Sequence, residues 1–457
     1  MFKPIFIILN SILMIHSHPF TSCDSNLVGI NSITLLPDPP KMKNNLQVTI
    51  NGTANSNITN PILQLEVEIM NVPLYNLKID ICKNNSCPLV KNKPYSLVFN
   101  YKIPDEQISD LTVDLKLVLS ENDHNIGCIK METIINNDNI NKYYYMRPKI
   151  VSDDIINKLF YRWSLKYNKV YNKISEKNNR YKIFKTNTLF ILNHHNSNYK
   201  LGHNYYSDMD SNEYKKKLGF KYSPKTKKNI KVNNLNNFSV PDLIDWRKLG
   251  AVTPVKNQGS CGSCWSFSTT GALEGAYFIK TGNLISFSEQ ELVSCDNTDN
   301  GCNGGLMDNA FKWISNNGGL CSENSYPYIS GKGTVNTCNK CTTITDSKII
   351  NYRDVESNTE SLKKAVAKQP VAVAIEADHL SFQLYHSGVY EGNCGNSLDH
   401  GVLIVGYGTL NNNDYWIVKN SWGNHWGNNG YIYIKRGKVQ NEGGECGIEL
   451  SASYPVL

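Results

Sequence analysis

Short runs in which apolar and polar residues alternate recur along the first third of the chain. Clusters of Pro, Gly and Asn separate them, and the clearest runs are Leu46–Ile50, Leu63–Ile69, Leu97–Tyr101 and Leu111–Leu119. Successive side chains of a β-strand point to opposite faces, so each run predicts a strand with one buried face. Strands at this spacing indicate an antiparallel β-sandwich between Ser32 and about Ile135.

The pattern changes to helical spacing between Asp153 and Lys200. The apolar positions there are Ile156, Leu159, Phe160, Trp163, Tyr167, Tyr181, Phe184, Leu189 and Leu192. Recurrence every three or four residues predicts helices that each bury one face. Residues 220–238 are rich in Lys and Asn and have no apolar period, which predicts an exposed linker that a protease can cut.

The chain begins with the pattern of a secretory signal peptide. Lys3 precedes an apolar stretch from Ile5 to Ile15, and small and polar residues follow at 17–22. The stretch is too short to span a bilayer as a helix. We therefore expect residues 1–22 to be a signal peptide and the protein to be lysosomal or secreted.

Net charge also changes along the chain. Residues 151–240 contain 18 Lys and Arg against 6 Asp and Glu, whereas residues 241–457 contain 16 against 21. A basic segment can bind nucleic acid or an anionic membrane, but in an exported chain it more simply docks on an acidic neighbouring domain. We favour docking, and we expect no nucleic-acid partner, no transmembrane segment and a monomer.

The thirteen cysteines fit an oxidising compartment and divide unevenly. Four lie in the first third and can pair completely, none lies between residues 129 and 260, and nine follow. Nine cysteines leave one over. An odd thiol in an exported protein is either a stray or a reactive group that is kept reduced.

The reactive candidate stands in the segment Gln258-Gly-Ser-Cys261-Gly-Ser-Cys264-Trp265. Cys264 lies where a Gly-Ser turn gives way to a helical run that extends to Lys280. The free N–H groups and partial positive charge of a helix N-terminus favour thiolate over thiol, and a neighbouring imidazolium lowers the thiol pKa further. We therefore expect an ion pair that is nucleophilic at mildly acidic pH.

His400 is the best candidate for the base among ten histidines. It opens an apolar strand, where a polar ring is costly without a partner. Asn420, on the adjacent strand, can accept the proton of the far imidazole nitrogen, and Trp422 can cover that hydrogen bond. Gln258, six residues before Cys264, can donate its side-chain amide to an oxyanion beside the backbone N–H of Cys264.

These residues, with Val240-Pro-Asp-Leu-Ile-Asp-Trp-Arg247 at the start of the segment, resemble the cathepsin L-like peptidases of the papain family. The resemblance covers residues 240–457. It implies an α+β fold, a papain-like two-lobed peptidase with Cys264 in a helical half and His400 in a sheet half. It also implies a cysteine-type endopeptidase that works through a Cys264 acyl-enzyme, with no cofactor and no metal.

The helical segment resembles the inhibitory propeptides of the same family. Positions of the ERFNIN motif are matched by Glu176, Arg180, Ile183, Phe184, Asn187 and Ile191. The stretch Gly202-His-Asn204-Tyr-Tyr206-Ser-Asp208 resembles the accompanying GxNxFxD motif, although Tyr206 replaces its Phe and His195 stands where the last ERFNIN asparagine is expected. The resemblance implies that the protein is made as a zymogen.

Family positions also imply a substrate cleft and a set of disulfides. The cleft residues are Asn303, Gly304, Gly305, Leu306, Met307, Ala374, Leu398, Gly401, Trp422 and Ser451. With no carboxylate at Ser451, the pocket for the side chain two before the scissile bond should prefer bulky apolar residues over Arg. The implied disulfides are Cys261–Cys302, Cys394–Cys446, and Cys295 with Cys338 or Cys341, which leaves Cys321 to take whichever remains.

Only six residues separate Cys295 from Cys302. This spacing leaves no room for the histidine-bearing loop that makes some relatives of the family carboxydipeptidases. We therefore expect internal cleavage of polypeptides.

The predicted sandwich resembles the ML lipid-recognition family, an immunoglobulin-like fold. The matching residues are Ile33–Pro40, Asn51-Gly-Thr, Ile81-Cys82, Cys87-Pro-Leu89 and Gly127-Cys128. The resemblance implies a lipid or sterol between two sheets and the disulfides Cys23–Cys128 and Cys82–Cys87. Glycosylation sequons begin at Asn51, Asn57, Asn84 and Asn237.

The sequence thus predicts four segments: a signal peptide (1–22), an ML-like sandwich (23–148), an inhibitory propeptide with its linker (149–239) and a papain-like cysteine peptidase (240–457). The principal hypothesis is an endopeptidase zymogen. The alternative is a lipid-binding or lipid-transfer protein whose peptidase part only processes it.

Overall fold

The computed structural model of the protein describes residues 17–23, 28–41, 43–103, 112–135, 151–196, 198–221, 240–392, 394–437 and 443–457. The chain divides into two compact units, Met1–Lys173 and Ile174–Leu457. Residues 1–16 of the expected signal peptide, Asn237 and most of the expected linker lie outside the described residues. No helix among the described residues is long and apolar enough to cross a membrane.

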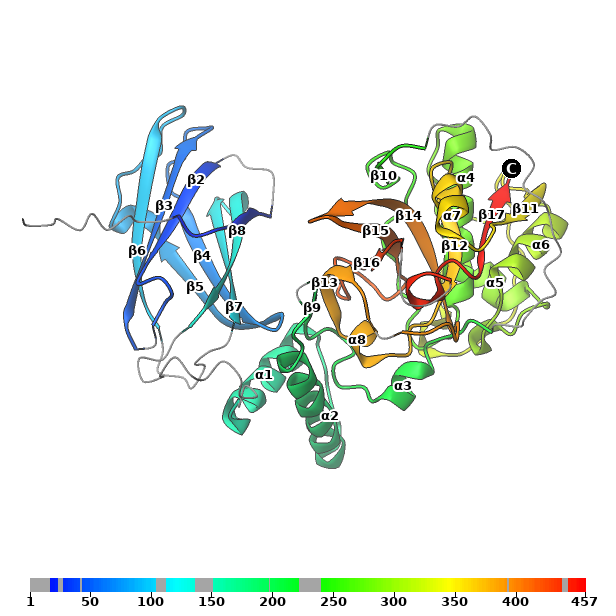
Figure 1. Ribbon diagram of the computed structural model, residues 1–457, viewed down its shortest axis with the longest axis horizontal. Coiled ribbons are helices and arrows are strands. Elements are labelled where there is room, and N and C mark those ends of the chain that lie inside the picture. The colour runs from blue at the N-terminus through cyan, green and yellow to red at the C-terminus, as the bar shows by residue number, and fades with distance from the viewer. Residues whose placement is uncertain are drawn as a thin grey trace, which may run out of the picture. The chain divides into compact units, whose positions relative to one another are not determined.

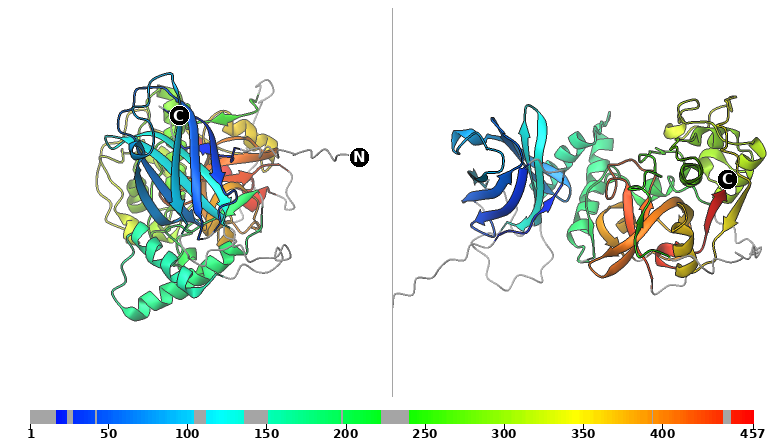
Figure 2. Two further views of the ribbon diagram at one scale, coloured as in Figure 1. Left: turned by 90° about the vertical axis from the view of Figure 1, so that its left-hand side faces the viewer. Right: turned by 90° about the horizontal axis from the view of Figure 1, so that it is seen from above.

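The first unit contains two antiparallel sheets that form a sandwich (Figures 1 and 2). One sheet has the strand order β1-β8-β7-β4-β5 and the other the order β2-β3-β6. The strands are β1 (Thr21–Ser22), β2 (Val28–Leu36), β3 (Asn45–Ala54), β4 (Ile62–Ile69), β5 (Val72–Asp80), β6 (Pro94–Lys102), β7 (Thr112–Glu121) and β8 (His124–Ile134), with the 3-10 helix η1 (Ile81–Lys83). The predicted sandwich is confirmed.

Strand β4 shows how the alternating pattern builds the sandwich core. Its residues Leu63, Leu65, Val67 and Ile69 are buried, whereas the residues between them are half-buried. The disulfides Cys23–Cys128 and Cys82–Cys87 are present, as the family resemblance implies.

Residues 17–22 also lie on the sandwich. Strand β1 pairs with β8, and the Ser17 hydroxyl donates to the Ile33 carbonyl at 3.3 Å. A signal-peptide cleavage after Ser22 would remove these contacts. The cleavage position therefore stays a prediction.

Helix α1 (Asp153–Lys166) completes the first unit. The Ser152 hydroxyl accepts from the Ile155 N–H and caps the helix, and Asp153 and Asp154 place negative charge at its N-terminus, where the helix dipole favours it. The predicted apolar face is buried, and it contains Ile155, Ile156, Leu159, Phe160 and Trp163.

The second unit begins with α2 (Ile174–Leu192), β9 (Tyr199–Leu201) and α3 (Ser211–Lys215). The helix α2 was predicted, although Leu189 on its predicted apolar face is 38% exposed. Strand β9 pairs antiparallel with β13 (Tyr385–Tyr390), so this segment extends the sheet of the domain that follows it.

That domain has a helical half and a sheet half, as predicted. Helix α4 runs between the sheet and helices α5 and α6 (Figure 1). The helices are α4 (Cys264–Thr281), α5 (Glu289–Cys295), α6 (Met307–Asn317), α7 (Thr359–Val366) and α8 (Leu380–Gln383), with the 3-10 turns η2 (Gly301–Asn303), η3 (Ser330–Lys332) and η4 (Glu445–Gly447).

The sheet has the strand order β11-β17-β12-β14-β15-β16-β13-β9, and β10 pairs with β14. Its remaining strands are β10 (Ile244–Asp245), β11 (Asn351–Asp354), β12 (Val371–Ile375), β14 (His400–Leu410), β15 (Asn413–Lys419), β16 (Tyr431–Lys435) and β17 (Ala452–Val456). Strands β14 and β15 are antiparallel neighbours, which brings the start of one beside the end of the other.

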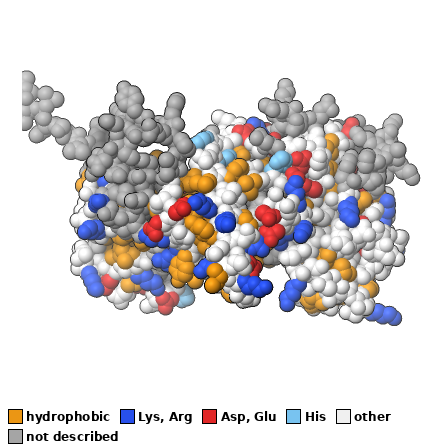
Figure 3. Space-filling view, turned by 90° about the horizontal axis from the view of Figure 1, so that it is seen from below, with side chains coloured by type: hydrophobic (Ala, Val, Ile, Leu, Met, Phe, Trp, Pro, Cys, Tyr) orange, Lys and Arg blue, Asp and Glu red, His pale blue; other side chains and the backbone are white. Residues whose placement is uncertain are grey.

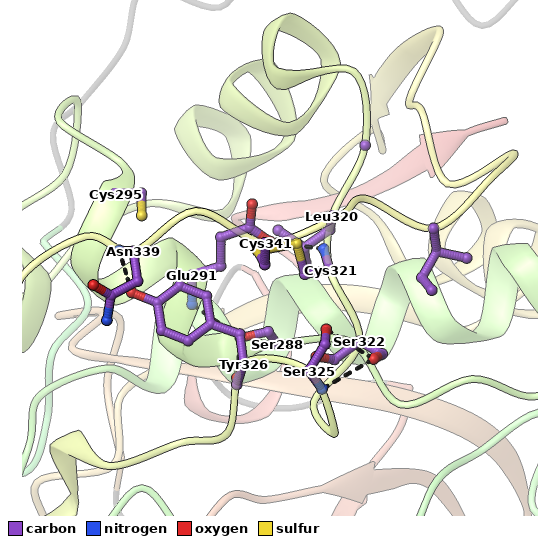
Figure 4. Close-up of a disulfide and its surroundings, with 12 residues drawn as sticks. Ser288, Glu291, Cys295, Leu320, Cys321, Ser322, Ser325, Tyr326, Asn339 and Cys341 are labelled. Atoms are coloured by element: carbon purple, nitrogen blue, oxygen red, sulfur yellow. Dashed lines mark hydrogen bonds between the residues drawn. A yellow bond between two sulfur atoms is a disulfide. The ribbon is translucent and has the colours of Figure 1, made fainter.

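Four disulfides hold the loops of this domain: Cys261–Cys302, Cys394–Cys446, Cys295–Cys338 and Cys321–Cys341. The structure thus assigns the two pairings that the sequence left open. At the Cys321–Cys341 bridge, the Cys321 N–H donates to the Glu291 carboxylate at 2.7 Å (Figure 4). On the face shown in Figure 3, Lys and Arg side chains are scattered among Asp and Glu.

Candidate active site

Cys264 is the first residue of α4 and the one free cysteine among the described residues. Its sulfur accepts from the backbone N–H of Gly401 at 3.3 Å. A Cβ on Gly401 would lie 3.3 Å from the backbone of Cys264 and Trp265, so the glycine lets β14 approach the helix end closely. The start of the sheet strand and the N-terminus of α4 therefore meet at the thiol.

His400, the first residue of β14, is fully buried beside this contact. Its Nε2 lies 2.8 Å from the Asn420 Oδ1, which also accepts from the Ser421 N–H and is thereby assigned as the oxygen. Nε2 then carries the proton, and Nδ1, which has no hydrogen-bond partner among the described residues, is left as the basic nitrogen. The Trp422 ring stacks on the imidazole with centroids 4.7 Å apart.

Burial disfavours the charged form of both groups in this form of the protein. It raises the pKa of the Cys264 thiol to about 11, although N–H donors from Gly401 and Gly219 act against the rise. It lowers the pKa of His400 to about 4, although the Asn420 hydrogen bond favours the charged ring. The ion pair expected from the sequence stays a prediction. Burial opposes it here, because an uncompensated charge away from water is costly.

Gln258 is fully buried and held in one orientation. Its Oε1 accepts from the Ser421 hydroxyl at 2.7 Å, which leaves Nε2 to donate. Nε2 donates to the carbonyls of Cys261 and Lys217, both at 2.9 Å. The donor predicted for an oxyanion thus points at a carbonyl of the segment that follows α3.

Residues 217–220 of that segment cover the site with backbone contacts. The Gly219 carbonyl accepts from the Gly305 N–H at 2.9 Å, and the Phe220 N–H donates to the Asp399 carbonyl at 2.9 Å. The bridge between Phe220 and Gly305 is parallel. A Cβ on Gly219 would lie 1.8 Å from the Gly262 carbonyl oxygen, so only glycine fits there. No sequence motif announced these contacts, because they use main-chain groups.

The Phe220 side chain lies in a buried apolar cluster that contains three of the predicted pocket residues, Met307, Ala374 and Leu398. Leu306 packs against the same cluster, and the Ser451 carbonyl accepts from the Ala374 N–H at 2.9 Å. Most of the predicted pocket residues therefore belong to, or border, the same apolar cluster as Phe220.

The other predicted cleft residues are placed differently. Gly305 forms the backbone contact with Gly219, and Gly304 next to it has a φ of 107°, which favours glycine. Asn303 is exposed at the end of η2. Trp422 covers His400 rather than lining the Phe220 cluster.

A buried ionic network supports the site from behind. The Lys256 ammonium donates to Glu274 at 3.0 Å and to Glu289 at 2.5 Å, and all three side chains are largely buried. Lys419, directly before Asn420, donates to the Thr253 hydroxyl at 2.9 Å, and burial lowers its pKa to about 8. Paired charges of this kind tie α4 to the end of β15.

Carboxylates stabilise the segment that covers the site. Arg180 of α2 binds Glu213 of α3 at 2.5 Å, within the segment itself, whereas Lys215 of α3 binds Asp378 of the peptidase at 2.7 Å. The Asn198 amide donates to Glu391. Burial raises the pKa of Glu391, but hydrogen bonds from Lys435 and Asn198 outweigh it and leave the pKa below its usual value.

The sandwich contains a second concave site. An apolar cavity lies between its sheets, and with its opening it measures about 570 Å³. Its lining residues are Leu35, Pro40, Leu46, Val48, Leu65, Val67, Tyr75, Tyr101, Ile103, Val113, Leu115, Leu117, Met131, Thr133 and Ile135. None of these carries a charge.

Three of the predicted glycosylation sites fall on described residues. Asn57 and Asn84 are exposed, whereas Asn51 is half-buried and its side-chain nitrogen donates to the Ser32 hydroxyl. A glycan attaches at that nitrogen, so Asn57 and Asn84 are the better acceptors.

Comparison with known proteins accounts for each segment. The family model of the papain family cysteine proteases matches residues 240–456, that of the cathepsin propeptide inhibitor domain (I29) matches 160–214, and that of the ML domain matches 17–135. Probable cysteine protease RD21C of Arabidopsis thaliana is 48% identical over 308 residues, which are 65% of this chain and 68% of the relative. The chain belongs to the papain family of cysteine proteases.

Solved precursors of this family have the same fold. The proform of the Amb a 11 cysteine protease of ragweed pollen is 39% identical, with a TM-score of 0.61, over 67% of this chain and 96% of that one. Digestive procathepsin L 3 of Tenebrio molitor is 36% identical, with a TM-score of 0.59, over 66% and 99%. The protein is therefore a cysteine protease zymogen, and the inhibitor-domain match places residues 160–214 in its propeptide.

The close approach at Gly219 gives a test of the covering segment. Gly219→Ala should weaken propeptide docking, because the new Cβ would meet the Gly262 backbone and overpacking typically costs about 1–3 kcal/mol, or about 5- to 150-fold in an equilibrium. Hydrolysis of a small peptide by the uncut precursor at pH 7.5 should rise accordingly. Lys216→Ala, at an exposed neighbouring position, is the control. Equal activity of the two variants would show that Gly219 is not under this constraint.

Proposed function

We propose that this zymogen yields an endopeptidase whose nucleophile is Cys264, with His400 as its base, Asn420 as the residue that orients the base and Gln258 as an oxyanion donor. The observation that carries the proposal is the contact of the Cys264 sulfur with Gly401, directly after His400, together with the hydrogen bond of His400 to Asn420. Nucleophile, base and orienting group are the three parts that covalent catalysis by a thiol requires.

The chemistry follows from these positions. His400 Nδ1 takes the proton of the Cys264 thiol, and the sulfur attacks the scissile carbonyl carbon. The oxyanion accepts from Gln258 Nε2 and the Cys264 N–H. As the intermediate collapses, the peptide C–N bond breaks and the imidazolium gives its proton to the leaving amine. Water, deprotonated by His400, then cleaves the thioester and restores the thiol.

The propeptide explains how the precursor avoids cutting itself at the site. The propeptide carbonyl that accepts from Gln258 Nε2 is that of Lys217. The Gly219 N–H faces the Cys264 sulfur. The bridge of Phe220 with Gly305 is parallel and fixes the direction of the docked chain. Docked in this way, the propeptide occupies the Gln258 donor and places an N–H, not a carbonyl carbon, at the sulfur.

Acidification should release this segment. Two of its contacts with the peptidase use carboxylates, those of Asp378 with Lys215 and of Glu391 with Asn198. Because the pKa of Glu391 is lowered, its contribution is complete above the usual carboxyl pKa of about 4.3 and is lost as the pH falls through the lowered value. The Glu391 contact should therefore still hold at pH 4.5 and resist release there.

The Phe220 cluster supports a preference for bulky apolar side chains two residues before the scissile bond.

The sandwich cavity supports a bound lipid or sterol, since an uncharged apolar lining cannot satisfy a charged head group. The six disulfides support a lysosomal or secreted location. The alternative function is a lipid carrier whose peptidase part only processes it. In that case the four proposed catalytic residues would cleave no other substrate.

The catalytic assignment predicts how two variants behave. Cys264→Ala should abolish peptide hydrolysis and leave the precursor uncut when it is shifted from pH 7.5 to 4.5, whereas the wild type should yield a fragment that begins near Val240.

Asn420→Ala should retain weak turnover, about 10²- to 10⁴-fold below wild type, because it orients the base and does not react. Asn351→Ala, on β11, is the control. Hydrolysis by a purified Cys264→Ala protein would refute the assignment.

The pocket predicts specificity. Wild type should cleave a peptide with Phe two before the cut faster than one with Arg. Ser451→Glu should raise kcat/KM for the Arg peptide, because a carboxylate would then face the guanidinium. Ser325→Glu, in an exposed turn, should leave the ratio unchanged. If Ser451→Glu behaves like Ser325→Glu, Ser451 does not border this pocket.

The cavity predicts a bound lipid. Organic extraction of the folded Cys264→Ala precursor should release about one lipid per chain. Val48→Trp should abolish this, because the larger ring fills the cavity, whereas Val98→Trp, on the other face of the same sheet, should not. A folded wild-type sandwich that yields no lipid, even after incubation with lipid vesicles, would leave the cavity without this role.

A further inference from the structure

Along the chain, the boundary between the two compact units lies inside the inhibitor segment and not at its start. The inhibitor family matches residues 160–214, yet the first unit ends at Lys173 and the second begins at Ile174. Helix α1 therefore belongs with the sandwich, and α2 belongs with the peptidase. One inhibitor is divided between two bodies.

Direct contacts hold α1 on the sandwich. The helix packs against β5, the strand at the end of its sheet. At the C-terminus of α1, the Lys166 ammonium donates to the Asn71 carbonyl at 2.7 Å and lies 3.6 Å from the Glu68 carboxylate. The Lys166 and Glu68 side chains are only 25% and 21% exposed, so this is a partly desolvated pair rather than a surface ion pair.

The hairpin that joins β4 and β5 is shaped for this contact. Met70 and Asn71 both have positive φ values, of 50° and 65°, as in the two-residue turns that match the twist of a hairpin. The Asn71 carbonyl that accepts from Lys166 belongs to this turn. Tyr167, directly after the helix, is buried, and its pKa is raised by burial and by the nearby Glu68.

Helix α1 needs such a partner. It has 14 residues, and isolated helices of this length are marginal in water, so most of its stability must come from packing of its buried face. An edge strand likewise gains from being covered. The contact therefore stabilises both sides, and loss of the sandwich contact should melt α1.

We propose that the sandwich is a working part of the inhibitor: it keeps α1 folded and, through α1, the propeptide seated on the peptidase. The sandwich then sets how readily the zymogen activates. When the linker before Val240 is cut, the sandwich leaves together with the propeptide.

The test compares full-length precursors. Hydrogen exchange is measured at pH 7.5 in the Cys264→Ala background for Lys166→Met and for Glu68→Gln, which keeps the shape of its side chain. Both should raise exchange in α1 by about tenfold or more, while the strands of the peptidase stay protected. Arg162→Met, an exposed position one turn earlier on the same helix, should change nothing.

Activation supplies a second readout. With Cys264 intact, Lys166→Met and Glu68→Gln should process several-fold faster than Arg162→Met at pH 4.5. Unchanged exchange of α1 in both variants would overturn the proposal. So would raised exchange with an unchanged processing rate, since the sandwich would then hold α1 without contributing to inhibition.

Discussion

The hydrogen bond from the Gln258 side chain to the Lys217 carbonyl joins the proposed oxyanion donor to the segment that covers the site. The Ser421 hydroxyl fixes the direction of the amide, so the donor is present whether or not the propeptide is bound. A propeptide that uses this donor also brings Gly219 over the sulfur and Phe220 into the apolar cluster. The covering segment therefore occupies the groups that the proposed mechanism uses, and it excludes water at the same time.

Exclusion of water sets the charge state of the site. A thiolate and an imidazolium stabilise each other, but both are costly in a closed site, and the neutral pair is favoured there. Departure of the propeptide admits solvent and removes this cost. The helix N-terminus can then stabilise the Cys264 thiolate, and the Asn420 oxygen can stabilise the His400 imidazolium. The same residues can thus be inert in the precursor and reactive in the released enzyme.

Much of this arrangement could be predicted from the sequence, because local chemistry marks it. Cys264 at a turn-to-helix junction, His400 at the start of an apolar strand and the alternating runs of the sandwich each carry a pattern. Residues 217–220 carry none, since their contacts use backbone groups that any sequence possesses. The contact that holds α1 on the sandwich was missed for the same reason. Lys166 binds a backbone carbonyl, and a charged residue on a helix usually predicts only a solvated face.

The sandwich and the peptidase are different folds in one chain, and the propeptide is the segment that both of them hold. Its division between α1 and α2 gives the cell two places at which to release the inhibitor. In the proposed account, acid acts on the carboxylate contacts of the peptidase, while the state of the sandwich acts on α1.

The central claim, that the propeptide holds Cys264 as a neutral thiol, is tested most directly by the pH dependence of its alkylation. Cys264 is the free cysteine of the described chain, so iodoacetamide reports on it alone. The uncut precursor should react very slowly at pH 5–7 and speed up only at strongly alkaline pH, in line with a pKa near 11. The activated enzyme should already react at pH 5. A precursor alkylated at pH 5 as fast as the activated enzyme would contradict the account.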